Sequence, residues 1–258
     1  MAKRKALRIL VTNDDGIHAP GLKVLEAIAA KLSRDVWVVA PELEQSASSH
    51  SLTLHQPLRV RHVSPRRFAV SGTPTDSVVM AINQLVPDRK PDLVLSGVNR
   101  GANLAEDVTY SGTIAAAMEG TLLGVPSIAL SQAYVAPHPV HWATAERHAP
   151  ALIRKLLAAG WPSEVLLSIN FPAVRASDVR GVRVSVQGRR DAGNIVIMER
   201  EDPRRTIYFW LGFRRQVGKV KRDSDLAVVR EGAISVTPLR MEFTHEPTRR
   251  RLAGALRR

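Results

Sequence analysis

The sequence lacks cysteine, is poor in aromatic residues and has no long apolar run. Its 258 residues include no cysteine and only 5% aromatic residues. The absence of cysteine excludes disulfide bonds, thiolate metal sites and cysteine nucleophiles. The basic start at residues 3–5 is similar to that of a signal peptide, but Arg8 interrupts the apolar segment behind it. No other run approaches the ~20 residues that span a membrane, so we expect a cytoplasmic protein without a membrane segment.

The chain is strongly basic, with 37 Lys and Arg against 24 Asp and Glu and a formal net charge of +13. Such an excess favours polyanionic partners, which include nucleic acid, nucleotides, polyphosphate and acidic membranes. Part of the charge lies in a basic tail at about 247–258. A basic chain end is usually a solvated surface, and basic and aromatic residues do not interleave as in single-strand binders. Nucleic-acid binding by the tail is therefore the less favoured interpretation.

The apolar pattern predicts an α/β fold built on a mostly parallel sheet. An apolar run at 7–11 and another at 36–40 flank a segment at 20–32 with helical spacing, as in a βαβ unit. No G-x-G-x-x-G follows the first run, which argues against a dinucleotide site. Further buried strands are predicted at 91–96, 125–130 and 165–170. A chain of this length fits one domain, and we expect residues 1–258 to form one.

Two adjacent carboxylates, Asp14 and Asp15, follow the first predicted strand in the stretch Asn13 to Gly16. Neighbouring carboxylates repel each other and are costly to bury unless a cation neutralises them. Ligands of open α/β sheets bind at the carboxyl ends of the strands. A hard metal ion, Mg²⁺ or Mn²⁺, is therefore one interpretation. The other is a solvated turn, because Asn, Asp and Gly are common turn residues.

Two polar loops should reach the same edge of the sheet. The loop after the second strand contains Ser46, Ser49 and His50, and the loop after the strand at 91–96 contains Asn99 and Asn103. Hydroxyl and amide oxygens are neutral ligands for a hard cation. A Ser–His–Asp triad with either serine is a weaker alternative, because no nucleophile elbow is present.

Ser111, Gly112 and Thr113 open a strongly predicted helix. Backbone N–H groups, two hydroxyls and the positive end of the helix dipole would together form a phosphate cradle. Ordinary helix capping is the alternative explanation. Hard metal plus phosphate is the chemistry that uses all of these signals.

Five stretches resemble the SurE (survival protein E) family, in order and over nearly the whole chain: NDDGIHAPGL, APELEQSASSHSLT, SGTPTDSV, PDLVLSGVNRGANLAEDVTYSGTIAAAMEG and GAISVTPL. The resemblance implies a metal-dependent phosphatase that acts on nucleoside 5′- and 3′-monophosphates and, in some members, on short polyphosphate. It also implies a Rossmann-like three-layer core, an extended C-terminal hairpin and assembly into dimers or tetramers.

The resemblance further implies one divalent ion per subunit, Mg²⁺ or Mn²⁺, bound by Asp14, Asp15, Ser46 and Asn99. The phosphate would be held by Asn99, Asn103, Ser111, Gly112 and Thr113. We expect direct attack by metal-activated water, with either aspartate fitting the role of general base. A phosphoenzyme of the haloacid-dehalogenase type would need an Asp-x-Asp pattern, and here the aspartates are adjacent.

The resemblance also divides the chain. We expect a core at about 6–186 and 226–240 and a protruding oligomerisation region at about 187–225, with Tyr208 and Trp210 at a subunit interface. The competing function is a nucleic-acid or polyphosphate-binding protein that retains the fold without turnover. The net charge motivates that alternative, and the intact Asp14 and Asp15 count against it.

Overall fold

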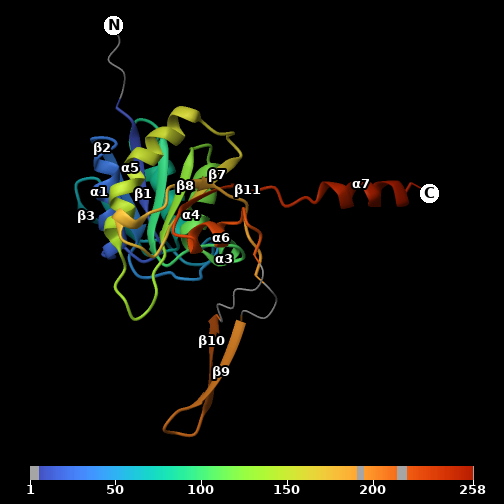
Figure 1. The fold of residues 1–258 in the computed structure, drawn as a ribbon. Helices are drawn as coiled ribbons and strands as arrows, with labels where there is room; N and C mark the ends of the chain where they lie inside the picture. Colours follow the sequence, from blue (N-terminus) through green and yellow to red (C-terminus); the bar gives the residue numbers. More distant parts are fainter. Residues whose placement is uncertain (1–5, 191–194, 214–219, 258) are drawn as a thin grey trace.

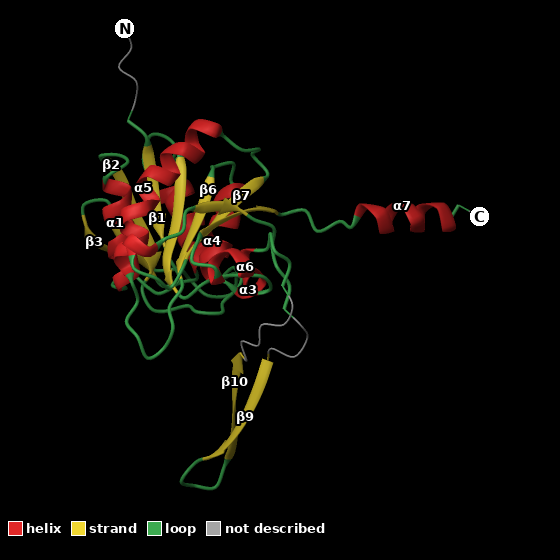
Figure 2. Cartoon of the chain, in the orientation of Figure 1, coloured by secondary structure: helices red, strands yellow, loops and turns green. Residues whose placement is uncertain are grey.

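A nine-stranded sheet with helices on both faces forms the body of the protein (Figures 1 and 2). This computed structural model describes residues 6–190, 195–213 and 220–257, so the basic start, two parts of the predicted region 187–225 and the last residue of the predicted tail lie outside the described residues. The strands of this sheet are β1 (Arg8–Thr12), β2 (Asp35–Pro41), β3 (Val60–Ser64), β4 (Arg67–Val70), β5 (Leu93–Arg100), β6 (Ser127–Gln132), β7 (Val165–Phe171), β8 (Val182–Val184) and β11 (Ile234–Arg240).

The sheet has the order β3-β4-β2-β1-β5-β6-β7-β11-β8. The strands from β4 to β7 in this order are all parallel to one another. β3 and β11 run antiparallel to their neighbours β4 and β7. The predicted mostly parallel α/β sheet is therefore confirmed, and the antiparallel strands lie toward its two edges.

Side chains of the central strands are buried on both faces, which gives three layers. Ile9 and Val11 of β1 pack on the face covered by α1 (Pro20–Ala30) and α5 (Trp142–Ala159), whereas Leu10 faces α2 (Pro74–Met80) and α4 (Gly112–Leu122). Successive residues of a strand point to opposite faces. The remaining helices are η1 (Ala81–Leu85), α3 (Asp107–Tyr110), η2 (Ala176–Asp178), α6 (Asp225–Arg230) and α7 (Glu246–Ala255).

Some predicted elements differ from the observed ones in detail. Helix α2, for which no bounds are predicted above, begins at Pro74 behind a capping box of Thr73 and Asp76 and continues as the π-helical turn η1. The polar stretch after the strand at 91–96 is partly strand, because β5 continues past an irregularity between Ser96 and Asn99. Asn99 therefore lies within β5, near its carboxyl end.

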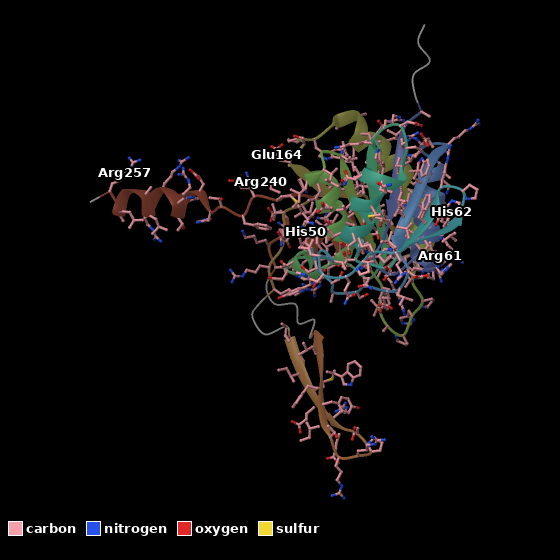
Figure 3. The ribbon with its side chains drawn as sticks, turned by 180° about the vertical axis from the view of Figure 1, so that it is seen from behind. His50, Arg61, His62, Glu164, Arg240 and Arg257 are labelled. Atoms are coloured by element: carbon pink, nitrogen blue, oxygen red, sulfur yellow. The ribbon has the colours of Figure 1, made fainter. Side chains whose placement is uncertain are left out.

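Two elements project from the body. The antiparallel hairpin of β9 (Ile195–Glu201) and β10 (Ile207–Phe213) extends away from the sheet, with Tyr208 and Trp210 exposed (Figure 1). The basic tail forms helix α7, which has no buried residue and carries Arg257 beyond its end (Figure 3). The sequence had indicated a basic tail but not a helix there. Within the described ranges, no helix is long and apolar enough to cross a membrane.

Candidate active site

A cavity of about 360 Å³ lies where the polar loops behind β1, β2, β5 and β6 meet the start of α4. Six of the predicted site residues line it: Asp14, Asp15, Ser46, Asn99, Asn103 and Ser111. Its other lining residues are Glu44, Ala47, Arg100, Gly101, Ala102, Asp107, Tyr110 and Tyr134. Most of these side chains follow the carboxyl ends of parallel strands, which explains why residues far apart in the sequence meet here. We call this expectation the strand-end rule.

Asp14 is the most deeply buried carboxylate of this cavity. It lies two residues beyond β1 and is 4% exposed. The hydroxyl of Thr113 donates to its Oδ1, and the backbone N–H of Thr113 also donates to it. Burial raises the pKa of Asp14 to about 7, the hydrogen bonds from Thr113 oppose that rise, and the neighbouring Asp15 adds to it. An ionised Asp14 is therefore unfavourable until a positive charge lies beside it.

Asp15 also lines the cavity and is less buried than Asp14. Burial raises its pKa and Glu44 adds to the rise, whereas the backbone N–H of Arg100, at 3.3 Å from Oδ2, lowers it. Glu44 accepts a hydrogen bond of 2.8 Å from the Ser46 hydroxyl. Glu44 was not predicted as a site residue, although it lies two positions before Ser46 in a stretch that pointed to the family.

The two predicted asparagines are oriented by bonds to their amide nitrogens. Asn99 Nδ2 donates to the carbonyl of Gly101 at 2.9 Å, and Asn103 Nδ2 donates to Ser131 Oγ at 2.9 Å. Asn170 clamps the backbone of Asn103, because its Oδ1 accepts from the Asn103 N–H and its Nδ2 donates to the Asn103 carbonyl. In both asparagines, Oδ1 is thus the side-chain atom left available to a ligand.

The start of α4 is built as a cap and as a support for Asp14. Ser111 Oγ accepts from the N–H of Ile114 at 3.1 Å, which is the capping bond that the sequence allowed. A Cβ at Gly112 would lie 2.8 Å from Asp14 Cβ, so only glycine permits this approach. Gly112 and Thr113 contact Asp14 and do not line the cavity. Their contact with phosphate stays a prediction.

Arg100 and Tyr134 were also missed by sequence reasoning. The Arg100 guanidinium lies over the Tyr134 ring at 5.2 Å from its centroid, within cation–π range. Tyr134 follows the end of β6 by two residues, so the strand-end rule applied to β6 would have found it.

The alternative Ser–His–Asp triad is not assembled among the described residues. His50 pairs with Glu119 at 2.9 Å, and the hydroxyl of Ser49 donates to the carbonyl of Thr109. The Ser46 hydroxyl donates to Glu44. Neither serine therefore has the hydrogen bond to histidine that would activate it.

The donor set fits a hard divalent cation. The described parts of the chain contain no group of three or more His, Cys, Asp or Glu that could hold a metal. A cation here would bind two carboxylates, Asp14 and Asp15, and the neutral oxygens of Ser46 and Asn99. Oxygen ligands of this kind suit Mg²⁺ and Mn²⁺. The raised pKa of buried Asp14 points the same way, because a cation would offset the cost of ionising it.

Comparison with known proteins identifies the family. Residues 9–194 match the family model described as "Survival protein SurE". The chain belongs to the SurE family. It is 58% identical over 255 residues to the "5′-nucleotidase SurE" of Paramagnetospirillum magneticum, covering 99% of this chain and 98% of the relative. It is 59% identical over 254 residues to the "5′-nucleotidase SurE" of Parvibaculum lavamentivorans, covering 98% and 92%.

The SurE assignment extends to the three-dimensional structure. The crystal structure of the SurE protein from Aquifex aeolicus superimposes with a TM-score of 0.81 at 35% identity, covering 93% of this chain and 96% of that one. The family expected from the five stretches is thereby confirmed. This SurE chain matches its relatives over nearly their full length, so its cavity and its hairpin both lie within the compared region.

Proposed function

We propose that this SurE-family chain hydrolyses nucleoside 5′-monophosphates to nucleoside and phosphate. The observation that carries the proposal is the pair of adjacent carboxylates, Asp14 and Asp15, in one cavity with neutral oxygen donors and the amino end of α4. Relatives at 58% and 59% identity named 5′-nucleotidase support it. Cation, carboxylate and helix terminus are the components that phosphoryl transfer to water requires.

Asp14, Asp15, Ser46 and Asn99 would hold one divalent ion, Mg²⁺ or Mn²⁺. When bound, the ion supplies the charge that polarises a phosphoryl oxygen and acidifies a water molecule. Asp15 is the better general base, because Asp14 is nearly inaccessible and already accepts two hydrogen bonds from Thr113.

The rest of the cavity wall would bind the phosphate. Asn103 and Ser111 line the cavity beside the amino end of α4, where backbone N–H groups and the helix dipole favour an anion. Gly112 and Thr113 belong to the same first turn. Arg100 adds a guanidinium that can pair with phosphate oxygens. These donors would stabilise the charge that develops as water attacks phosphorus.

The same cavity would accept 3′-monophosphates and short polyphosphate, since all of these present a terminal phosphate. We propose further that the chain is one domain that acts in the cytoplasm and assembles as a dimer or tetramer through the β9–β10 hairpin. Nucleic-acid binding by the α7 arginines remains the less favoured function, because a basic chain end is usually a solvated surface.

The test is phosphate release from 5′- and 3′-nucleoside monophosphates and short polyphosphate, with Mg²⁺, Mn²⁺ or EDTA. The variants are Asp15→Asn and the control Asp178→Asn, which changes an exposed aspartate on η2. We expect release that needs the metal, collapses in Asp15→Asn and persists in Asp178→Asn. A folded parent protein that releases no phosphate from any substrate would overturn the proposal.

A further inference from the structure

The loop at 104–107, which joins β5 to α3 and ends at the first residue of α3, is hydrogen-bonded to residues 187–190, called here the arm root because they precede the β9–β10 hairpin. Asp107 in this loop lines the cavity. Gln187 Nε2 donates to the carbonyl of Ala105 at 2.9 Å, and the Arg190 N–H donates to Glu106 Oε1 at 2.8 Å. Two segments about 80 residues apart in the sequence thus pair along their length.

Arg190 makes several hydrogen bonds to the loop at 104–107. Its guanidinium is a two-pronged partner of Asp107, with Nη1 2.9 Å from Oδ1 and Nη2 2.7 Å from Oδ2. Nη1 also donates to the carbonyl of Leu104 at 3.0 Å. The Arg190 side chain is only 8% exposed. A two-pronged, largely buried pair of this kind fixes both position and orientation.

A second buried carboxylate ties the same two segments together. Asp225, at the start of α6, is 1% exposed. Its Oδ2 accepts from the N–H of Ala105 and its Oδ1 from the N–H of Gly188, both at 2.9 Å. A Cβ at Gly188 would lie 2.6 Å from Asp225 Oδ1, so the packing is close. The arm root and the loop therefore form one unit.

The charge of Asp107 matters for what the cavity can bind. Asp14, Asp15 and Glu44 already line the cavity, and Asp107 is the fourth carboxylate there. A divalent cation beside Asp14 and Asp15 would leave Asp107 without an ion-pair partner if Arg190 were absent. A free carboxylate near a phosphate dianion repels it, more strongly in a partly buried site than in water.

We infer that Arg190 is a positioning residue for substrate binding, which neutralises Asp107 and fixes the loop at 104–107 against the arm root. The inference rests on the proposed nucleotidase function. Arg190 does not line the cavity, and it acts on the phosphate site through Asp107. The position of the arm root is thereby coupled to the shape and the charge of the cavity.

The test uses the variant Arg190→Met, which removes the charge and keeps an unbranched side chain, and the charge-retaining variant Arg190→Lys, assayed with a 5′-nucleoside monophosphate and saturating Mg²⁺. We expect KM to rise about tenfold in Arg190→Met with kcat within about twofold, and a smaller rise in Arg190→Lys. Arg183→Met is the control, because Arg183 pairs with Glu231 at 2.7 Å outside the cavity. Thermal unfolding of each variant shows whether it is folded.

The decisive variant is the double change Arg190→Met with Asp107→Asn. Removing the uncompensated charge should bring KM back to within about threefold of the parent value, which a general loss of structure would not allow. An unchanged KM in Arg190→Met, or a raised KM that the second change does not reduce, would overturn the inference. Failure of the proposed function would look different, because the parent protein itself would release no phosphate.

Discussion

Asp14 makes the metal-free protein lose stability as the pH rises, and Asp14→Asn should remove that loss. Burial raises the pKa of Asp14 from its usual 3.8 to about 7 in the folded chain. In the unfolded chain the group ionises at its usual value. The folded state therefore binds the proton more tightly, and the free energy of unfolding falls as the pH rises from about 4 through about 7.

The magnitude follows from the two pKa values. Each pKa unit corresponds to ~1.4 kcal/mol, so the rise from 3.8 to about 7 corresponds to ~4 kcal/mol lost between pH 4 and pH 8. That is a large share of the ~5–15 kcal/mol by which folded proteins are usually stable. The asparagine in Asp14→Asn keeps an oxygen that can accept the hydrogen bond from Thr113, but its side chain cannot ionise. Its unfolding free energy should lack this component of the pH dependence.

The assay is urea-induced unfolding in EDTA at pH 4, 5, 6, 7 and 8, for the parent and for Asp14→Asn. We expect the parent to lose ~4 kcal/mol relative to the variant across this range. Excess Mg²⁺ at pH 8 should restore most of the loss in the parent and little in the variant, because ligand binding stabilises the state that binds it. If the two proteins change in parallel with pH, or if the parent gains stability, the account of Asp14 is wrong.

Three further changes test other parts of the structure. Gly112→Ala puts a Cβ 2.8 Å from Asp14 Cβ and should displace Asp14. We expect kcat/KM for nucleotide hydrolysis to fall at least tenfold. Activity like that of the parent would show that the close contact between Gly112 and Asp14 is not needed. Asp76→Ala removes the acceptor for the Thr53 N–H and hydroxyl and should destabilise by ~3 kcal/mol in urea unfolding, against less than ~1 kcal/mol if these bonds are dispensable. Leu211→Glu charges an exposed position on β10 and should reduce the assembled mass in sedimentation velocity, whereas an unchanged mass would place the interface elsewhere.

The central fold was predictable because its signals are local. Apolar runs of strand length, separated by a segment of helical period, determine the βαβ start at Leu10 and its neighbours. The strand-end rule then placed Asp14, Asp15 and Asn99 at one edge, and the structure finds them around one cavity. The capping interpretation of Ser111 was also correct, since a serine before a helix has few other structural roles.

The remaining features depend on contacts that are distant in the sequence. Thr113 lies 99 residues from Asp14, so no local pattern could show that its hydroxyl donates to that carboxylate. Arg190 and Asp107 are 83 residues apart, and neither forms a recognisable motif with the other. Helix α7 was missed for a different reason. A short arginine-rich end has the composition of a solvated tail whether or not it is helical.

The cavity gathers four carboxylates in a chain with a net charge of +13, and Asp107 differs from Asp14 and Asp15 in its bonded partners. Asp107 has a built-in partner, Arg190, whose side chain is largely buried. Asp14 and Asp15 have no arginine or lysine side chain bonded to them within the described ranges; Arg100 reaches Asp15 through its backbone N–H. Under the proposed function, an exchangeable cation would balance their charge. A permanent partner there would fill the position that a cation needs to contact both the carboxylates and a phosphate.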